Sequence, residues 1–516
     1  MEEDRRTVLG IEFGSTRIKA VMLDSEHKVI SSADYKWQSE LKSGIWTYKL
    51  SDVWSGLKFV LREISCKDSV CCVGISGMMH GYLPFDKDWN LLTDFRTWQN
   101  TITEEASTEL SSLFNVNIPQ RWSISHYYQA ILNHEDHVKD VAHITTLSGY
   151  VHFMLTGKNV VGIGEASGMF PIDNNTKKYD NEMLSKFNAL LRENGIEKNI
   201  ELMLPSVLLA GQDAGCLTKE GSQYIDSLLA EGVSFAPPEG DAGTGMVATN
   251  SVAPFTGNVS AGTSIFSMIV LEKPLKKAYR EIDMVTTPSG NPVAMVHCNN
   301  CTRDLNDWVA LFIQAATAML GTAPDLNSAF TSLYSSSLNG DIDCGGIVIY
   351  NYIAGEEITR LNEGRPFILR CANSNFNICN FIRAHIYSAF ATLRLGLEIL
   401  SKEGVVIKSL VGHGGLFKTP GVAQRYLAGA CNTPVTCMQT AGDGGPYGMA
   451  LLAAYSKWKR RDEDLEHYLA ERVFPYVSSN TLLPGKADVD GFNQYIENFR
   501  RCIHVELAAI ESLPNK

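Results

Sequence analysis

The segment Ile11-Glu12-Phe13-Gly14-Ser15-Thr16 joins two apolar, strand-like stretches, and a similar turn, Ser260-Ala261-Gly262-Thr263-Ser264, occurs in the second half of the chain. In each turn a glycine is followed by two hydroxyl residues. Glycine has no Cβ, so backbone N–H groups can approach a phosphate closely, and the hydroxyls add donors. The pair therefore predicts two hairpins that clasp a nucleotide between them.

A carboxylate loop lies between these turns in the sequence. In Glu239-Gly240-Asp241-Ala242-Gly243-Thr244-Gly245 small residues surround Asp241, which can therefore reach a metal-bound phosphate or a substrate hydroxyl. Each of these motifs also occurs in ordinary loops. Their order and repetition are what indicate phosphoryl transfer from ATP.

Length and composition limit the class of protein. The 516 residues predict two or three domains, and no apolar run reaches the ~18–20 residues of a membrane span. The charged N-terminus passes directly into a strand, unlike a signal peptide. A formal net charge of -12 without a long basic stretch argues against a nucleic-acid partner. We therefore expect a cytoplasmic protein that binds small molecules, with neither nucleic acid nor a membrane as partner.

Two of the 12 cysteines, Cys298 and Cys301, follow His297 with the only metal-like spacing in the chain. A second ligand pair at zinc-finger spacing is missing. Free cysteines are commonly buried as small hydrophobes in a reducing compartment. Structural thiols are therefore favoured over a metal site.

Periodicity in the first half indicates an α/β arrangement. It predicts a hairpin over residues 8–23, a helix over 51–63 capped by Ser51, and a buried strand over 70–75. His80 follows that strand. Ligands of α/β sheets lie beyond the carboxyl ends of strands, so His80 is expected at a substrate site, although a local turn hydrogen bond would also explain it.

The second half repeats this plan. It predicts a hairpin over 257–272, an irregular stretch over 273–292, a strand over 293–297 and a helix over 382–400. A glycine turn at 412–415 then ends a short strand and leads into another helix. Such a turn lets adenine and ribose lie against backbone, which makes Gly414, Gly415 and Lys418 candidate nucleotide contacts.

With these elements in order, the chain resembles the FGGY carbohydrate kinases of the actin-like ATPase superfamily. The resemblance covers nearly everything from Thr7 to Tyr455. It rests on residues 8–24, 73–81, 98–100, 205–215, 240–245, 257–263 and 412–421. It implies an α/β fold of two ribonuclease-H-like lobes with a nucleotide and sugar cleft between them. We expect an N-terminal lobe over 1–253, a C-terminal lobe over 254–460, and a helical tail over 461–516 packed on the second lobe.

The resemblance also implies the reaction, which is transfer of the γ-phosphate of ATP to a hydroxyl of a ketose or polyol. By motif match Asp241 is the catalytic base and also contacts sugar and metal. Glu12 stands where the family usually has Asp, and would bind Mg²⁺ directly or through water. The extra methylene moves this carboxylate by more than about an ångström, which could alter the metal geometry. The expected nucleotide contacts are Gly14, Ser15, Thr16, Arg17, Gly262, Thr263, Ser264, Gly414, Gly415 and Lys418.

The expected sugar contacts are Met79, His80, Trp98, Asn100 and Asp241. The segment Met79-His80-Gly81 resembles the Met-His-Gly of xylulokinases, which favours a ketopentose such as xylulose. The residues after Trp98, however, lack the Asp and the Arg usual in the family. Changing one hydrogen-bonding group can alter discrimination strongly, so ribulose, a deoxyketohexose or a glycerol-like polyol remain alternatives.

Two other interpretations stay open at this point. An actin-like nucleotide-switch ATPase without sugar phosphorylation would share both hairpins, although no peptide-binding domain follows the second lobe. A family member that binds its ligands without turnover is suggested by Glu12 and the altered region around Trp98. The sequence does not fix the oligomeric state and leaves a homodimer open.

Overall fold

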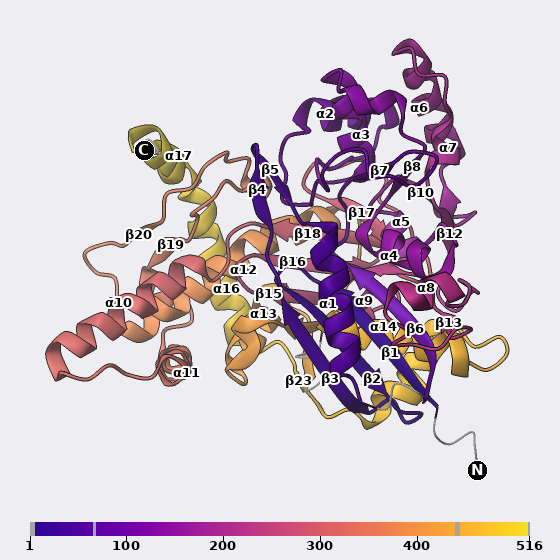
Figure 1. Cartoon of the computed structure of the whole chain (residues 1–516). Coiled ribbons are helices and arrows are strands. Elements are labelled where there is room, and N and C mark those ends of the chain that lie inside the picture. Colours follow the sequence, from indigo (N-terminus) through magenta and orange to yellow (C-terminus); the bar gives the residue numbers. More distant parts are fainter. Residues whose placement is uncertain (1–5, 66–68, 439–443, 514–516) are drawn as a thin grey trace.

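The computed structural model describes residues 6–65, 69–438 and 444–513, and its first sheet contains the first predicted hairpin (Figure 1). The strands are β1 (Thr7–Phe13), β2 (Arg17–Leu23), β3 (Val29–Lys36), β6 (Val70–Gly77), β13 (Ser234–Phe235) and β14 (Glu239–Gly240). Their order is β13-β6-β1-β2-β3, with β14 also paired to β6. Strand β1 is antiparallel to β2 and parallel to β6, so the loops after β1 and β6 leave the same edge.

The second sheet repeats this arrangement. Its order is β17 (Asp283–Thr286), β18 (Pro292–Cys298), β16 (Ile265–Val270), β15 (Thr256–Ala261), β21 (Ser409–His413), β22 (Val435–Met438) and β23 (Ser479–Leu482). Strand β15 is antiparallel to β16 and parallel to β21, as β1 is to β2 and β6. The two predicted hairpins are therefore confirmed as equivalent parts of two similar sheets.

Helices cover both faces of the first sheet, which explains why all of β1 is buried. On one face lies α1 (Leu50–Glu63), through Val53, Leu57 and Val60. The predicted Ser51 cap was wrong, because the helix begins at Leu50 and its N-cap residue is Lys49.

The other face of this sheet is covered by a helix that follows the second sheet in sequence, α14 (Gly444–Trp458). A Cβ at Gly10 would meet the carbonyl oxygen of Pro446 and the amide nitrogen of Ala450, and a Cβ at Gly74 would lie 2.5 Å from Met449 Cε. Glycine at both positions lets the helix approach the strands closely. Helix α14 also packs on α9 (Asp241–Ala248), where Gly448 lies against the carbonyl of Thr244.

Further elements of the first half come between β6 and β13 in the sequence and lie mostly at the top of Figure 1. They are α2 (Glu104–Phe114), α3 (Ser123–Leu132), α4 (Leu147–Thr156), α5 (Ile163–Ala166), α6 (Asn181–Glu193), α7 (Ile200–Met203), α8 (Lys219–Tyr224), and the paired short strands β7 (Leu83–Phe85) with β8 (His143–Thr145), β9 (Val160–Gly162) with β12 (Ser206–Leu208), and β10 (Ile172–Asp173) with β11 (Lys178–Tyr179). A separate small hairpin, β4 (Glu40–Lys42) and β5 (Ile45–Thr47), precedes α1.

Besides α14, the α-helices described in the second half are α10 (Arg303–Leu320), α11 (Leu326–Ser336), α12 (Ile378–Lys402), α13 (Val422–Cys431), α15 (Leu465–Tyr468), α16 (Lys486–Arg501) and α17 (Ile503–Ser512), with a short hairpin β19 (Val348–Tyr350) and β20 (Phe367–Leu369). The stretch 273–292, expected to be irregular, contains the edge strand β17. The predicted helix over 382–400 is the central part of α12.

The described part of the tail contacts both halves of the molecule. Helix α16 places Phe492, Tyr495 and Phe499 in the core of the second half. In α15, the Tyr468 hydroxyl lies 2.6 Å from Nε2 of His27, which follows β2. The division of the chain at residues 253 and 460 stays a prediction.

Candidate active site

Asp241 is the first residue of α9 and lies where β14 ends beside β6. Its Oδ1 accepts a hydrogen bond of 3.1 Å from the backbone N–H of Met79, in the loop after β6. Burial raises the pKa of Asp241, while hydrogen bonds from the backbone N–H groups of Met79, Ala242 and Asp241 itself lower it. The loop after β6 therefore fixes this carboxylate and favours its charged form.

Glu12, the second candidate carboxylate, is near the end of β1, next to Ser76 of β6 and Lys19 of β2. Burial, followed by the negative charge of Asp241, raises the pKa of Glu12 to about 7, and Lys19 opposes the shift. A Cβ at Gly445 would collide with the Glu12 carboxylate. The start of α14 thus lies directly against Glu12, close to Asp241.

His80 is buried in the same loop, with a backbone φ of 74° that few residues other than glycine adopt. Its Nδ1 lies 3.1 Å from the carbonyl oxygen of Gly168, which can only accept, so Nδ1 carries the hydrogen. Burial, and then the charge of Arg121, lowers the pKa of His80 well below its usual value. His80 is therefore neutral and keeps Nε2 as an acceptor.

The other two predicted sugar contacts differ in what their side chains do. Trp98 is 39% exposed, and its Nε1 donates to Ser15 Oγ at 3.3 Å, which links the loop around Trp98 to the first predicted phosphate turn. Asn100 is buried and exchanges hydrogen bonds with the backbone of Trp46, while its Nδ2 also donates to the carbonyl of Thr97. Asn100 thus holds its own loop together, and its contact with sugar stays a prediction.

The first phosphate turn is held by side chains around it. The Gly14 carbonyl accepts from Trp37 Nε1 at 2.7 Å, and the Ser15 carbonyl accepts from the Tyr48 hydroxyl at 2.6 Å. Arg17, predicted to contact nucleotide, forms an ion pair with Asp34 of β3. With its carbonyls occupied in this way, the turn is fixed before any ligand binds.

The second phosphate turn joins the predicted adenosine turn. Gly262 N–H donates to the Ser264 carbonyl at 2.9 Å, and the Gly262 carbonyl accepts from Thr302 Oγ1 at 2.8 Å. Gly414 has a φ of 97°, and a Cβ there would lie 2.5 Å from the Ala261 carbonyl oxygen. Only glycine allows this approach. Gly415 to Lys418 follow as a single 3₁₀ turn.

Comparison with known proteins agrees with this geometry. Residues 7–233 match the FGGY family of carbohydrate kinases, N-terminal domain, and residues 257–457 match the C-terminal domain of the same family. The chain belongs to this family. This FGGY kinase is therefore an ATP-dependent carbohydrate kinase, which favours sugar phosphorylation over the nucleotide-switch alternative.

Individual relatives cover nearly the whole FGGY kinase chain. A xylulose kinase of Haemophilus influenzae is 23% identical over 515 residues, which span 95% of this chain and 98% of the relative. Among solved structures, a ligand-bound xylulose kinase from Lactobacillus acidophilus has a TM-score of 0.81 at 15% identity and covers 98% of this chain and 99% of its own. A gluconate kinase from the same species has a TM-score of 0.79 at 15% identity, over 98% and 99%. The expected two-lobed fold of the actin-like ATPases is confirmed.

Two buried acidic residues of this FGGY kinase were given no role from the sequence. Glu239 accepts from the backbone N–H groups of Gly164 and Glu165 at 3.3 and 2.9 Å, and burial raises its pKa to about 8. Glu165 accepts from Ser148 Oγ at 3.2 Å, and its Oε2 has no partner among the described residues. A single sequence gives no sign of Glu165, because it lies in a four-residue helix far from Asp241 in the chain.

In the described parts of the chain, no group of three or more His, Cys, Asp or Glu side chains is placed to hold a metal ion. Cys298 and Cys301 are buried free thiols, and burial raises the pKa of Cys301 above its usual range. Within the described residues no helix has the length and apolar character to cross a membrane.

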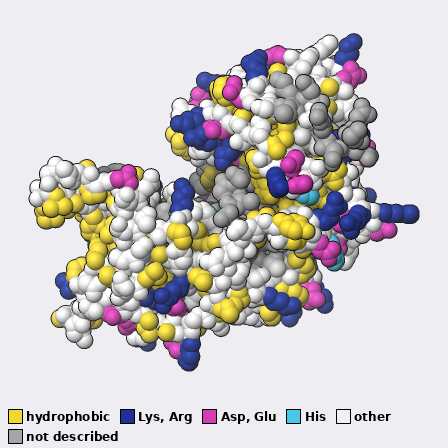
Figure 2. All heavy atoms as spheres, turned by 90° about the horizontal axis from the view of Figure 1, so that it is seen from below, with side chains coloured by type: hydrophobic (Ala, Val, Ile, Leu, Met, Phe, Trp, Pro, Cys, Tyr) yellow, Lys and Arg dark blue, Asp and Glu magenta, His cyan; other side chains and the backbone are white. Residues whose placement is uncertain are grey.

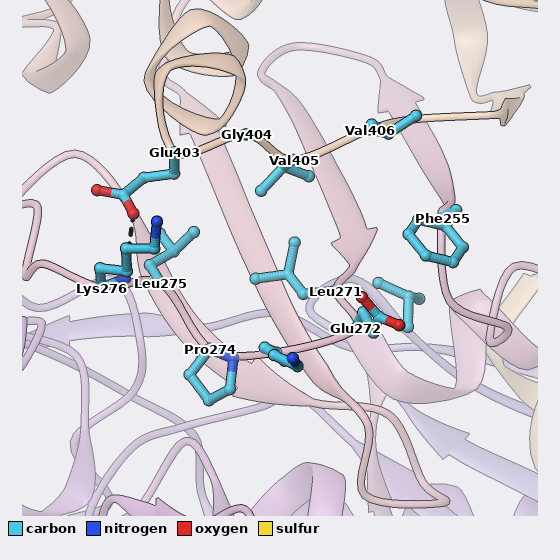
Figure 3. A pocket seen from close by; sticks show the side chains of 12 residues that line it. Phe255, Leu271, Glu272, Pro274, Leu275, Lys276, Glu403, Gly404, Val405 and Val406 are labelled. Carbon is cyan, nitrogen blue, oxygen red and sulfur yellow. Dashed lines mark hydrogen bonds between the residues drawn. The ribbon is translucent and has the colours of Figure 1, made fainter.

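A pocket of about 190 Å³ lies away from the candidate site residues (Figure 3). It is lined by Phe255, which precedes β15, by Leu271, which follows β16, and by the segment after α12 around Val405. Glu403 at its rim accepts from the backbone N–H of Lys276. Because the phosphate turn is at the other end of the β15–β16 hairpin, this pocket is separate from the predicted nucleotide site.

Proposed function

We propose that this FGGY kinase transfers the γ-phosphate of ATP to a hydroxyl of a ketopentose, with xylulose as the first candidate. The observation that carries the proposal is the hydrogen bond from the Met79 N–H to Asp241, beside His80. It joins the carboxylate that fits a catalytic base to the Met-His-Gly segment that resembles xylulokinases. The names of the relatives support the same substrate class.

In the proposed reaction Asp241 accepts the proton of the sugar hydroxyl. The hydroxyl oxygen then forms a bond to the γ-phosphorus, and the bond between that phosphorus and the bridging oxygen of ADP breaks. Phosphoryl transfer depends mainly on positioning and charge stabilisation. The Met79 N–H orients the carboxylate, and the neutral His80 can accept a hydrogen bond from a second sugar hydroxyl.

The donor set of the site fits Mg²⁺ in a particular way. Mg²⁺ is usually bound by one or two carboxylates together with substrate phosphates and waters, and two carboxylates, Glu12 and Asp241, lie close together here. Burial is the main cause of the raised pKa of Glu12, and the nearby negative charge of Asp241 adds to it. Glu12 and Asp241 would hold the ion, which supplies positive charge against the phosphates.

The free cysteines of the described chain support a cytoplasmic, reducing location.

ATP turnover with Mg²⁺ and a panel of xylulose, ribulose, gluconate and glycerol tests the proposal. One ketopentose should stimulate turnover strongly, and Asp241→Asn should lower that rate by about 10²- to 10⁴-fold. Asp213→Asn is the matched control, because the Asp213 side chain is 81% exposed and lies outside the site. Sugar-independent turnover, or an Asp241→Asn variant as active as the control, would refute the proposal.

A further inference from the structure

The side chain of His297, near the end of β18, has polar atoms without partners. Neither ring nitrogen has a hydrogen-bond partner among the described residues, although the residue is only partly exposed. Histidines that need no partner in the protein are ordinarily at the surface, where water supplies one, and Figure 2 shows surface histidines in cyan on one face. His297 therefore has to be judged by what surrounds it.

The ring of His297 lies on the face of the second sheet that packs against the first half of the chain. His297 is opposite Phe266 in the pairing of β16 with β18, and the two rings are stacked with centroids 6.5 Å apart. Met295 precedes His297 by two residues, so both side chains leave the same face of the strand. Met295 belongs to the same buried cluster as Met79 of the first half. His297 thus faces the half that carries the predicted sugar contacts.

Arg121 connects this face of the second sheet to the loop that carries His80. Its guanidinium pairs with Asp283 of β17, the strand next to β18, and its carbonyl accepts a hydrogen bond of 3.1 Å from the N–H of Gly81. Burial, and then the charge of Arg121, lowers the pKa of His297 to about 3, and the same two causes lower the pKa of His80. Arg121 is therefore close to both imidazole rings, one from each half.

The second predicted phosphate turn is also close to His297. The next residue of β18 pairs with Ile265, which directly follows the turn. The N–H of Cys301 donates to the carbonyl of Thr263 at 3.1 Å, so the chain after β18 is held against the turn. His297 is thus near both the turn expected to bind the phosphates of ATP and the loop of His80, which is expected to bind sugar.

We propose that His297 is a specificity-determining residue that hydrogen-bonds a hydroxyl of the sugar from the second half of the chain, as His80 does from the first. The inference rests on the proposed function, because it adds a contact to the same sugar. A neutral imidazole has one N–H donor and one acceptor nitrogen, and a hydroxyl group can both donate and accept. The sugar supplies the partner that the protein does not.

This contact links sugar binding to the position of the phosphates. Strands β16 and β18 are paired along their length, so His297 and the second phosphate turn move as one unit. A sugar bound by His80 and His297 together holds that unit against the loop that positions Asp241. A sugar that lacks the hydroxyl leaves the imidazole unpaired, which costs binding energy. His297 therefore favours sugars that carry a hydroxyl at this place.

Kinetics and calorimetric sugar binding test the contact, with the panel sugar that the parent phosphorylates best. His297→Phe keeps a ring against Phe266 but has no polar atom, so the KM and Kd for the sugar should rise about tenfold while the KM for ATP stays within about twofold. His297→Gln retains a donor and an acceptor and should recover part of the loss. His143→Phe is the matched control, because His143 also stacks on an aromatic ring, Trp89 at 4.5 Å, outside the candidate site.

His297→Ala covers the case in which phenylalanine does not fit, and it should weaken sugar binding in the same way. Variants that bind the sugar as the parent and His143→Phe do would overturn the inference and leave the proposed function intact. A rise in the KM for ATP alone would also overturn it, because the ring would then serve the phosphate turn. A best sugar that is not a ketopentose refutes only the proposed substrate, and the same variants still decide the role of His297. A parent that binds no sugar would refute both.

Discussion

Replacing Gly240 by alanine should impair catalysis without touching a reacting atom. The φ of -80° at Gly240 is one that alanine adopts readily, so only space is at issue. A Cβ would lie 2.9 Å from Met79 Cγ and closer still to Glu165 Oε2. Both neighbours are buried, and Glu165 is held by Ser148, so neither side chain can move away freely.

The size of the effect follows from these distances. Ordinary carbon contacts begin at about 3.4 Å, so the Met79 contact alone requires a shift of about 0.5 Å and the Glu165 contact requires more. Because the Met79 and Glu165 side chains cannot move freely, the backbone that carries Asp241 is expected to shift. A misplacement of about 1 Å costs on the order of 100-fold in rate, which predicts a loss of about 10- to 100-fold in kcat. Overpacking should also cost about 1–3 kcal/mol of stability.

Steady-state kinetics and urea unfolding of Gly240→Ala measure both quantities. The matched control is Gly245→Ala in the same helix, where a Cβ would meet nothing within 4 Å. That variant should keep kcat within about twofold and gain up to about 1 kcal/mol from its lower unfolded-state entropy. A folded Gly240→Ala enzyme with the kcat of the control would show that the position of the Asp241 backbone does not limit the reaction.

Three further predictions concern stability. The raised pKa of Glu12, about 7, means that the folded state keeps a proton that the unfolded state loses above pH 4.5, so stability falls as pH rises through this window. In metal-free thermal melts between pH 5 and 8, the Glu12→Gln variant should lack on the order of 3 kcal/mol of the stability loss that the parent shows. Stability-against-pH curves of parent and variant that run parallel would contradict this. Arg121→Met should cost about 3 kcal/mol in urea unfolding, because it leaves the largely buried Asp283 without its ion pair, and Asp283→Asn in the same chain should recover part of it. Gly10→Ala should cost at least about 1–3 kcal/mol by pushing α14 from the first sheet, and an unchanged melting temperature would refute the close packing.

Local patterns in the sequence were sufficient for the hairpins. They were not sufficient for residues 239–245, expected to form a loop, which are strand β14 followed by the start of α9. A strand-turn-strand pattern with Gly-Ser-Thr or Gly-Thr-Ser at its tip depends only on neighbouring residues, and both hairpins are found where expected. The position of α14 could not be predicted in this way. Its contact with Gly10 joins residues more than 400 positions apart, and nothing local says which sheet a small-residue helix will cover.

The predictions of an edge strand and of a helix start failed for a related reason. Strand β17 is four residues long and, among the strands that the structure describes, pairs only with β18. Four residues are too few to show a clear alternation of apolar and polar side chains. The α1 cap was misplaced because a serine near a helix start is common at several positions of the first turn. Asn100 shows the same limit at the site, since an amide suited to a sugar is equally suited to the backbone of Trp46.

The environments of the acidic residues around Asp241 differ in a way that supports the proposed role of Asp241 as base. Burial raises the pKa of all four, to about 7 in Glu12, to about 8 in Glu239, and well above the usual value in Glu165. Asp241 has the lowest intrinsic pKa of the group, and three backbone N–H groups favour its carboxylate form. For Glu165 the cause is burial first and then the negative charges of Glu239 and Asp241, which together disfavour its ionised form. These N–H groups act on the carboxyl beside Met79 and His80, where a base must be ionised before it can accept a proton.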